Sequence, residues 1–216
     1  MKFFIDTANL NQIKEANELG ILDGVTTNPS LMAKEGIKGE EAVTKHYKTI
    51  CEMVNGDISA EVISTKFDDI VAEGKKLAAI HKNIVVKVPM IKDGVKAMYW
   101  FTQNGIATNC TLCFSAGQAI LAAKAGAKYI SPFIGRIDDS GWDGMQLVAQ
   151  IAQIYEVQGY ETQILAASIR NPNHIIRAAE LGAHVVTSPL DSILGLLKHP
   201  LTDIGLAKFL EDAKKL

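Results

Sequence analysis

The chain has 216 residues, a length typical of one domain and sufficient to bury an apolar core without disulfides or a structural metal ion. Hydrophobic residues make up 48% of it and charged residues 21%, which excludes a disordered, collagen-like or disulfide-stapled chain. The net charge of −2 argues against an extended surface for binding nucleic acid. We therefore expect a single domain over residues 1–216.

Eight short apolar segments recur along the chain, and each predicts a β-strand buried on both faces. The strands are expected over residues 2–6, 24–28, 58–62, 84–89, 106–111, 129–133, 162–168 and 184–189. Stretches with apolar residues three and four apart lie between them and predict helices. Examples of these expected helices are residues 10–19, 67–80, 115–125, 143–158 and 172–181. A last helix is expected over 201–216, with Thr202 as its N-cap.

The number and spacing of these units indicate the architecture. Eight strand-plus-helix units in 216 residues average 27 residues each, close to the roughly 30 of a minimal βαβ unit. Eight even units favour closure into an α/β fold, a single (β/α)8 TIM barrel, here with an extra C-terminal helix. A doubly wound open sheet is the alternative, but it does not require such even spacing.

Features near the amino terminus and the cysteine count bear on location. Asp6 interrupts the first apolar residues too early for a signal peptide, and no run of 18 apolar residues predicts a membrane span. The three cysteines, Cys51, Cys110 and Cys113, are an odd number that cannot form a complete disulfide framework. These features predict a protein of the reducing cytoplasm with no membrane partner.

Polar side chains stand at or near the carboxyl ends of seven consecutive predicted strands, where TIM barrels place their active sites. They are Asp6, Thr7, Thr26, Thr27, Asn28, Ser30, Glu61, Lys87, Asn109, Thr111, Ser131 and Ser168. For any single Ser or Thr, a structural hydrogen bond is the more common explanation. Polar side chains at the ends of seven strands together predict a polar ligand-binding site at this face of the barrel.

Lys87 is the most informative of these residues, because it lies between Val86 and Val88 in a strand that must be buried. A buried cation is costly unless it deprotonates or pairs. Desolvation favours the neutral amine of a lysine, and such an amine can attack a carbonyl to form a Schiff base. The alternatives are a salt bridge to Glu61 or Asp6, or a side chain that extends to the barrel rim.

Two of only three arginines follow the sixth and seventh predicted strands, on the face that holds the polar strand ends. The planar guanidinium groups of Arg136 and Arg170 suit phosphate oxygens, and the Ser168 hydroxyl could bind the same anion. The alternative for Arg136 is a loop salt bridge to Asp138 or Asp139. We therefore expect an anion site in these loops.

Other candidate sites in the sequence are weak. Cys110 and Cys113 have the spacing of a zinc or redox pair, but a zinc site needs further ligands. Residues three apart in an extended strand point to opposite faces, so these thiols need not converge. No glycine-rich dinucleotide motif and no phosphate-binding loop occurs. We expect no metal ion and no cofactor.

Five motifs, taken together, resemble the transaldolase family. They are Thr-Thr-Asn-Pro-Ser-Leu at 26–31, Val-Lys-Val-Pro at 86–89, Asn-Cys-Thr-Leu at 109–112, Ser-Pro-Phe-Ile-Gly-Arg at 131–136 and Ala-Ser-Ile-Arg-Asn at 167–171. The similarity runs in order from Asp6 to about Pro189, and the length resembles the small subfamily that includes fructose-6-phosphate aldolases. The resemblance implies a TIM barrel with Schiff-base chemistry and no cofactor or metal. It also implies a homo-oligomer, a decamer of two pentamers in which C-terminal helices pack on neighbours.

The resemblance also implies catalytic roles for residues at the matching positions. Lys87 matches the lysine that forms the Schiff base with a sugar phosphate ketone. Asp6 matches the acid that takes the proton of the C4 hydroxyl as the C3–C4 bond breaks. Glu61 and Thr111 match the pair that positions a water for proton transfer during imine formation and release.

The same resemblance implies two binding subsites for phosphorylated sugars. Residues matching the subsite for the dihydroxyacetone portion are Asn28, Asn109 and Ser131. Residues matching the phosphate subsite are Arg136, Ser168 and Arg170. The implied reaction converts sedoheptulose 7-phosphate and glyceraldehyde 3-phosphate to erythrose 4-phosphate and fructose 6-phosphate, in the pentose phosphate pathway.

Two positions favour transfer over simple cleavage. In the aldolases of the family, the position of Phe133 is typically Tyr and that of Glu61 is typically Gln. A phenol helps a water to release the three-carbon intermediate, and Phe133 removes that donor. We therefore expect a transaldolase. The alternatives are a fructose-6-phosphate aldolase and a non-catalytic barrel that binds phosphorylated sugars.

Overall fold

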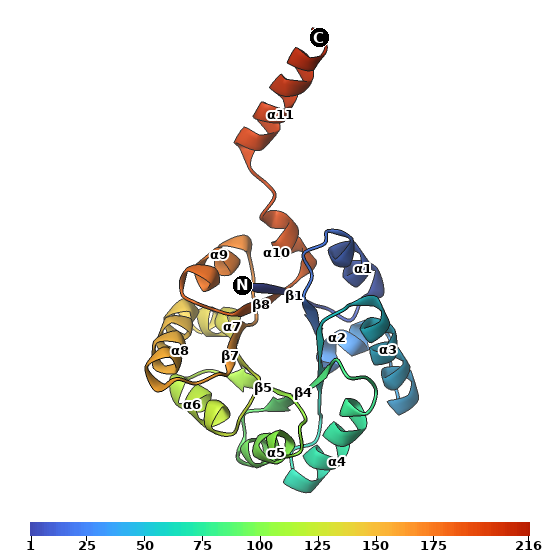
Figure 1. The fold of residues 1–216 in the computed structure, drawn as a ribbon, viewed down its shortest axis with the longest axis vertical. Helices are drawn as coiled ribbons and strands as arrows, with labels where there is room; N and C mark the ends of the chain where they lie inside the picture. The colour runs from blue at the N-terminus through green and yellow to red at the C-terminus, as the bar shows by residue number, and fades with distance from the viewer.

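The computed structural model describes all of residues 1–216 and contains a closed parallel barrel in which the strands follow their order in the chain (Figure 1). The strands are β1 (Lys2–Asp6), β2 (Gly24–Thr26), β3 (Asp57–Glu61), β4 (Ile84–Pro89), β5 (Thr108–Cys113), β6 (Tyr129–Pro132), β7 (Gln163–Ala166) and β8 (Val185–Ser188). Parallel pairing of β1 with β8 closes the ring. The predicted barrel is therefore confirmed, and the open sheet is excluded.

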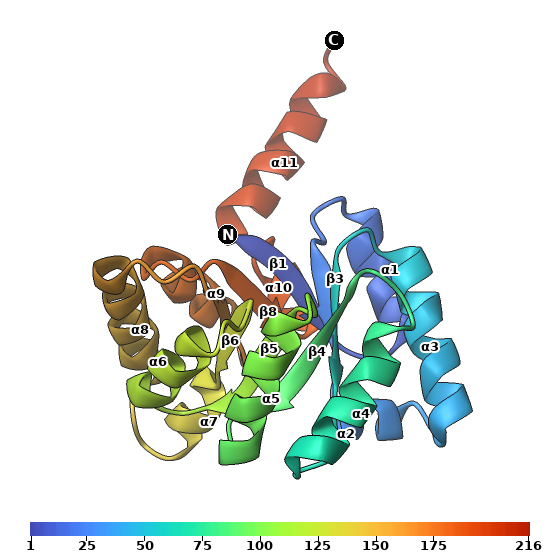
Figure 2. The ribbon, with the colours of Figure 1, turned by 60° about the horizontal axis from the view of Figure 1, so that its bottom comes forward.

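Eleven helices connect and surround the strands (Figures 1 and 2). They are α1 (Leu10–Glu18), α2 (Pro29–Lys34), α3 (Glu40–Met53), α4 (Phe67–Ala78), α5 (Lys92–Gln103), α6 (Ala116–Lys124), α7 (Ile134–Asp139), α8 (Gly144–Gln158), α9 (Pro172–Glu180), α10 (Leu190–Gly195) and α11 (Pro200–Ala213). The predicted helices match α1, α4, α6, α8 and α9 to within two residues at each end. Helices α2, α3, α5, α7 and α10 lie outside the stretches named above. In α3, the buried Tyr47, Ile50 and Cys51 nevertheless stand at helical spacing. None of the helices is both long and apolar enough to cross a membrane.

The terminal helix begins at Pro200, one residue before its predicted range of 201–216 and three residues before an N-cap at Thr202 would place it. The side chain of His199 accepts a hydrogen bond from the backbone N–H of Leu201, so His199 is the N-cap and Thr202 lies inside the helix. Pro200 takes the first helical position, where its missing N–H leaves no intrahelical bond unmade. Helix α11 has no buried residue and projects away from the barrel (Figures 1 and 2).

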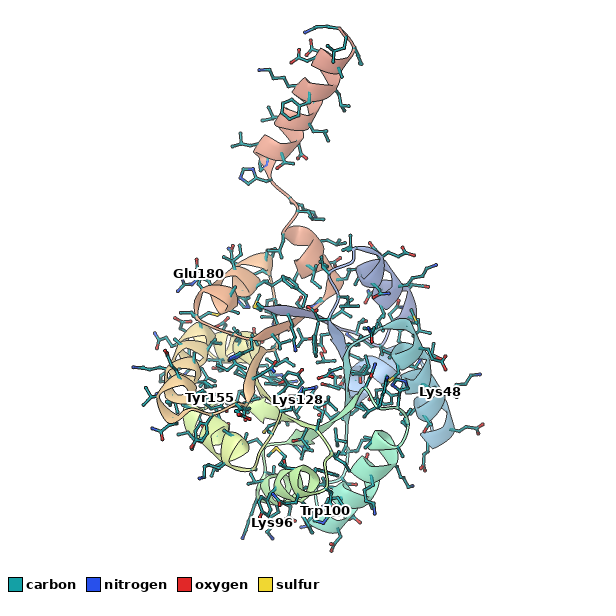
Figure 3. The ribbon with its side chains drawn as sticks, in the orientation of Figure 1. Lys48, Lys96, Trp100, Lys128, Tyr155 and Glu180 are labelled. Atoms are coloured by element: carbon teal, nitrogen blue, oxygen red, sulfur yellow. The ribbon has the colours of Figure 1, made fainter.

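The apolar side chains form two cores, because successive residues of a strand face opposite sides of the barrel wall. The larger core, of 44 buried residues, fills the layer between the strands and the surrounding helices (Figure 3). The smaller core lies inside the barrel and consists of Phe4, Val85, Tyr129, Leu165, Ala167 and Val185. Most of its members stand at the beginning or middle of their strands, which leaves the carboxyl ends for polar groups.

An irregularity in β5 corrects one expectation about the cysteines. Leu112 has a positive φ of 60°, and the pairing of β5 with β6 shifts register between Cys110 and Cys113. This bulge reverses the alternation of side chains. Both thiols are therefore buried in the same outer core, instead of pointing to opposite faces.

Candidate active site

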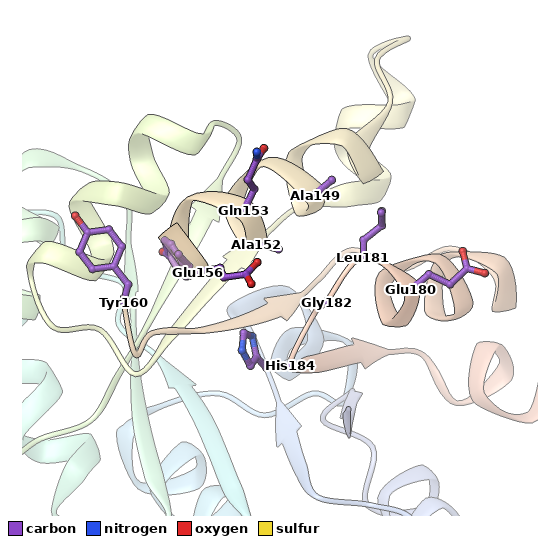
Figure 4. Close-up of a pocket in the computed structure, with 10 residues that line it drawn as sticks. Ala149, Ala152, Gln153, Glu156, Tyr160, Glu180, Leu181, Gly182 and His184 are labelled. Atoms are coloured by element: carbon purple, nitrogen blue, oxygen red, sulfur yellow. The ribbon is translucent and has the colours of Figure 1, made fainter. Parts of the chain in front are cut away.

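A cavity of about 230 Å³ lies at the carboxyl ends of the strands. Eight of the eleven predicted site residues line it, namely Asp6, Asn28, Lys87, Ser131, Phe133, Arg136, Ser168 and Arg170. Glu61, Asn109 and Thr111 do not line it and lie in the surrounding wall. A larger cavity, of about 580 Å³, lies beside α8 and the end of α9 and contains none of the predicted residues (Figure 4).

Lys87 projects into the barrel from β4 and is only 5% exposed. Its Nζ lies 2.9 Å from Oε2 of Glu61 and donates a hydrogen bond of 3.1 Å to the backbone carbonyl of Thr27. The register of β3 and β4 places Glu61 directly beside Lys87, which accounts for this choice of partner. Of the two acids considered for a salt bridge, Glu61 is therefore the partner and Asp6 is not. The ion pair offsets the cost of burying the ammonium group.

Asp6 is fixed by a pair of threonines at the ends of neighbouring strands. The Thr26 hydroxyl donates to Oδ1 of Asp6 at 2.7 Å and lies 2.6 Å from the hydroxyl of Thr187. Because Thr26 gives its only hydroxyl proton to the carboxylate, Thr187 is the donor in the second bond. Thr187 lines the cavity and was not predicted. Thr187 is a polar residue near the carboxyl end of the eighth predicted strand, which is the same pattern that identified the candidate residues on the other seven strands.

A buried hydrogen-bonded chain supports the opposite wall. Ser131 donates to Oδ1 of Asn109 at 2.8 Å, and Nδ2 of Asn109 donates to the Ser59 hydroxyl at 3.1 Å. Asn109 is fully buried and does not line the cavity, whereas Ser131 does. Asn109 therefore orients Ser131, and Ser131 is the group that a ligand in the cavity meets.

Asn28 both caps a helix and lines the cavity. Its Oδ1 accepts the backbone N–H of Leu31 at 3.0 Å, which fixes the start of α2. Pro29 occupies the first turn of that helix, where its ring suits the helical φ. Because Oδ1 is committed to the cap, the side-chain amide N–H groups are left to donate to a ligand.

Thr111 carries one of the few buried polar atoms that lack a partner. Thr111 is fully buried, and its hydroxyl oxygen makes no hydrogen bond within the protein. An unsatisfied buried hydroxyl costs about 1–3 kcal/mol. A water or a ligand atom beside Thr111 would remove that cost.

The two predicted arginines reach the cavity from adjacent loops, but with different partners. The guanidinium of Arg136 lies over the ring of Phe133, 5.0 Å from its centroid. Arg170 donates through Nη2 to Oδ2 of Asp139 at 2.7 Å. The salt bridge considered for Arg136 is therefore made by Arg170, while Asp138 contacts His174 and the N–H of Gly144.

Backbone contacts hold these two loops together. The N–H of Gly135 donates to the carbonyl of Ser168 at 3.0 Å, directly after a bridge between Phe133 and Ala167. A Cβ at position 135 would lie 2.2 Å from that carbonyl oxygen, so only glycine fits. Ser168 adopts a positive φ of 59°, which is rare for a residue with a side chain. The close approach of the loops brings Arg136 and Arg170 to one cavity.

The cysteines show no arrangement for metal or redox chemistry. All three thiols are free and buried, and burial raises the pKa of Cys51 and Cys113 to about 11. No three side chains of the His, Cys, Asp or Glu types converge as metal ligands. The chemistry that the cavity offers is that of one amine, two carboxylates, several hydroxyls and two guanidinium groups.

Comparison with known proteins relates the whole chain to one family. Residues 3–216 match the family model described as Transaldolase/Fructose-6-phosphate aldolase. A protein of Cytophaga hutchinsonii named "Probable transaldolase" is 67% identical over 216 residues, which span 100% of this chain and 99% of that protein. A protein of the same name from Phocaeicola vulgatus is 66% identical with the same coverage.

Comparison with solved structures bears on the fold alone. FabK from Thermotoga maritima superposes with a TM-score of 0.57, covering 87% of this chain and 57% of that chain. The two sequences are only 16% identical. The similarity therefore concerns the barrel and carries no argument about the site.

Proposed function

Because the chain belongs to the transaldolase/fructose-6-phosphate aldolase family, we propose that it is a transaldolase that moves a dihydroxyacetone unit between sugar phosphates. The observation that carries this proposal is the placement of Lys87. Its amine faces a polar cavity, held between a carboxylate and a backbone carbonyl, with a second carboxylate and two arginines lining the same space. An activated amine suits Schiff-base chemistry on a ketone, and the arginines suit a phosphate group.

The first proposed step is attack of Lys87 on the ketone carbonyl of the donor sugar. The ammonium must first lose a proton, and Glu61 at 2.9 Å is the acceptor within reach. The carbinolamine then loses water to give the iminium. The unpartnered hydroxyl of Thr111 supports a role for this residue in holding that water.

The second proposed step breaks the C3–C4 bond. Asp6 takes the proton of the C4 hydroxyl, the C4–O electrons form the aldehyde, and the C3–C4 electrons flow into the iminium to leave an enamine on Lys87. The hydrogen bond from Thr26 fixes one carboxylate oxygen of Asp6 and leaves the other for the substrate. The enamine then attacks a second aldehyde, and the steps run in reverse.

The proposed binding groups divide the cavity into two ends. Asn28 lies where its amide could donate to a hydroxyl of the dihydroxyacetone portion. Ser131, whose only hydroxyl proton goes to Asn109, could accept a hydrogen bond from another hydroxyl. Arg136, Ser168 and Arg170 would bind the phosphate, because two planar guanidinium groups suit its oxygens better than lysine does. A protein of net charge −2 can bind an anion through such local charges.

Phe133 supports transfer rather than cleavage. Its ring lines the cavity, packs edge-on against Phe114 with centroids 5.7 Å apart, and has no hydroxyl to deliver a proton to the enamine. The three-carbon intermediate would therefore persist until an acceptor aldehyde arrives. Cleavage of fructose 6-phosphate to free dihydroxyacetone is the alternative reaction.

Two measurements test the proposal. Borohydride added with fructose 6-phosphate should reduce the imine and leave a stable three-carbon adduct on the peptide that contains Lys87. If no adduct forms there, the protein is a phosphosugar-binding barrel or uses other chemistry. Free dihydroxyacetone should accumulate slowly without an acceptor, and transfer product should form quickly with erythrose 4-phosphate. Rapid release without an acceptor would identify an aldolase instead.

The exposed terminal helix supports a proposal about assembly. Four large apolar side chains of α11 are exposed, namely Leu201, Ile204, Phe209 and Leu210. So many exposed apolar side chains are unusual for a helix that does not pack against the rest of the protein. We propose that α11 packs on neighbouring copies in a homo-oligomer, a decamer as in the family. Sedimentation of the full chain should give a species far larger than the monomer of 23.4 kDa. Ile204→Asp should shift it toward smaller species.

We also propose that the reaction takes place in the cytoplasm. All three cysteines are free, which suits a reducing compartment.

A further inference from the structure

Tyr47 is a buried polar residue that the proposed chemistry leaves unused. It lies on α3, in the ring of helices outside the barrel, and is only 3% exposed. Its hydroxyl is 2.8 Å from the hydroxyl of Thr27, at the end of β2. The phenol therefore reaches from the outer helical layer to the strand ends that surround Lys87.

The direction of this hydrogen bond follows from the other contacts of Thr27. The Thr27 hydroxyl donates its only proton to the carbonyl of Ser59 at 3.2 Å. It can therefore only accept in its contact with Tyr47, and the phenol is the donor. Burial raises the pKa of Tyr47 to about 12, so the phenol keeps its proton throughout the neutral range.

The same threonine holds the amine of the site. Its backbone carbonyl accepts the hydrogen bond from Nζ of Lys87, and its N–H donates to the carbonyl of Ser59 at 3.3 Å. Thr27 is thus fixed at its hydroxyl and its N–H, and its carbonyl supplies one of the two contacts that orient Nζ. The other is Glu61, which is close enough to influence Tyr47 electrostatically.

We propose that Tyr47 is a positioning residue for Lys87, which it orients through Thr27. The phenol fixes the Thr27 side chain, so that the Thr27 carbonyl and the Glu61 carboxylate hold Nζ at one angle to the cavity. This inference rests on the proposed function, because it assumes that Lys87 attacks a carbonyl. Attack requires the amine lone pair to point at the substrate, and small errors in that geometry slow the reaction.

The test compares two tyrosine-to-phenylalanine variants. Tyr47→Phe removes one buried hydroxyl that is linked to Lys87. Tyr155→Phe removes another from an equally buried tyrosine, whose hydroxyl donates to the carbonyl of Ala119, and neither residue lines the cavity. We expect Tyr47→Phe to lower kcat and the rate of borohydride trapping about tenfold, with KM nearly unchanged. Tyr155→Phe should lower the unfolding temperature similarly and leave kcat unchanged.

A double-mutant cycle isolates the path through Thr27. Thr27→Val removes the hydroxyl while keeping the shape of the side chain. If the phenol acts through Thr27, adding Tyr47→Phe to Thr27→Val should cause no further loss of the trapping rate. Additive losses would overturn the inference, because they would show that the two hydroxyls act independently.

The outcomes separate this inference from the proposed function. If the unmutated protein forms the adduct on Lys87 but Tyr47→Phe matches Tyr155→Phe in kcat, only the role of Tyr47 is wrong. A loss in Tyr47→Phe that appears in KM instead of kcat also overturns it. If no adduct forms on Lys87 in the unmutated protein, both are overturned. Circular dichroism spectra of each variant establish that the fold is kept.

Discussion

The carboxylate of Asp139 lies 2.7 Å from the guanidinium of Arg170, at the edge of the cavity that Arg170 lines. Both side chains are more than half exposed, so this ion pair contributes little to stability. Its importance lies in the site, because a phosphate that binds Arg170 must approach a like charge. Asp139 holds the arginine in place, and under the proposed function its charge would oppose phosphate binding.

Asp139→Asn should lower KM for phosphorylated substrates about threefold, because it removes the like charge next to the phosphate. Inorganic phosphate should become a stronger inhibitor by a similar factor. Arg136→Ala should have the opposite effect, because it removes a cation from the proposed phosphate site, and should raise KM for the same substrates about tenfold or more. Unphosphorylated sugars should show little change with either variant. A raised KM in Asp139→Asn would contradict this interpretation.

Lys87→Met should abolish activity and also destabilise the fold. It keeps the length of the side chain but leaves the Glu61 carboxylate, which is only 16% exposed, without its cation. Removing one partner of a buried pair costs on the order of 3–5 kcal/mol. Chemical denaturation should show this loss, and adding Glu61→Gln should recover part of it. Unchanged stability in Lys87→Met would mean that the ion pair contributes nothing to the folded state.

Phe133→Tyr should shift the reaction from transfer toward cleavage. It adds a phenol to the cavity wall that can deliver a proton, through a water, to the three-carbon intermediate. The measurement is the ratio of free dihydroxyacetone to transfer product at a fixed concentration of acceptor. Phe114→Tyr, on the ring that packs against Phe133, is the control and should leave the ratio unchanged.

The cysteines should be inert in the native protein. Burial raises the pKa of the Cys51 and Cys113 thiols to about 11 and that of Cys110 well above its usual value. At pH 8 about one thiol in a thousand is therefore ionised even before access is considered. Iodoacetamide should leave activity intact and label none of the three, as measured by intact mass. All three should react after unfolding, and rapid labelling of the native protein would contradict the burial.

Much of the candidate site could be predicted because, in a parallel barrel, every residue at the carboxyl end of a strand lies at the same face of the barrel. Asp6, Lys87 and Ser131 each stand near the carboxyl end of a strand, and closure of the sheet brings all strand ends to one face. Lys87 was identifiable from chemistry alone, as a charge within an apolar strand. The same rule applied to the eighth strand would also have found Thr187.

The contacts that decide the chemistry could not be predicted in this way. The pairing of Arg170 with Asp139 depends on how two loops fold against each other, whereas sequence spacing pointed only to Arg136 as a partner. Tyr47 belongs to an outer helix, where an apolar face normally signals packing alone. The shared burial of Cys110 and Cys113 depends on a single residue with positive φ, which no periodicity reveals.

The apolar cluster inside the barrel has a consequence for the order of events. Phe4, Tyr129 and Val185 are at most 1% exposed and close the amino end of the barrel. The cavity is therefore a dead end with a single opening, at the carboxyl ends of the strands. In the proposed reaction, an aldehyde formed there would leave through the same opening by which the next aldehyde enters. The two aldehydes would then compete for the same covalent intermediate on Lys87.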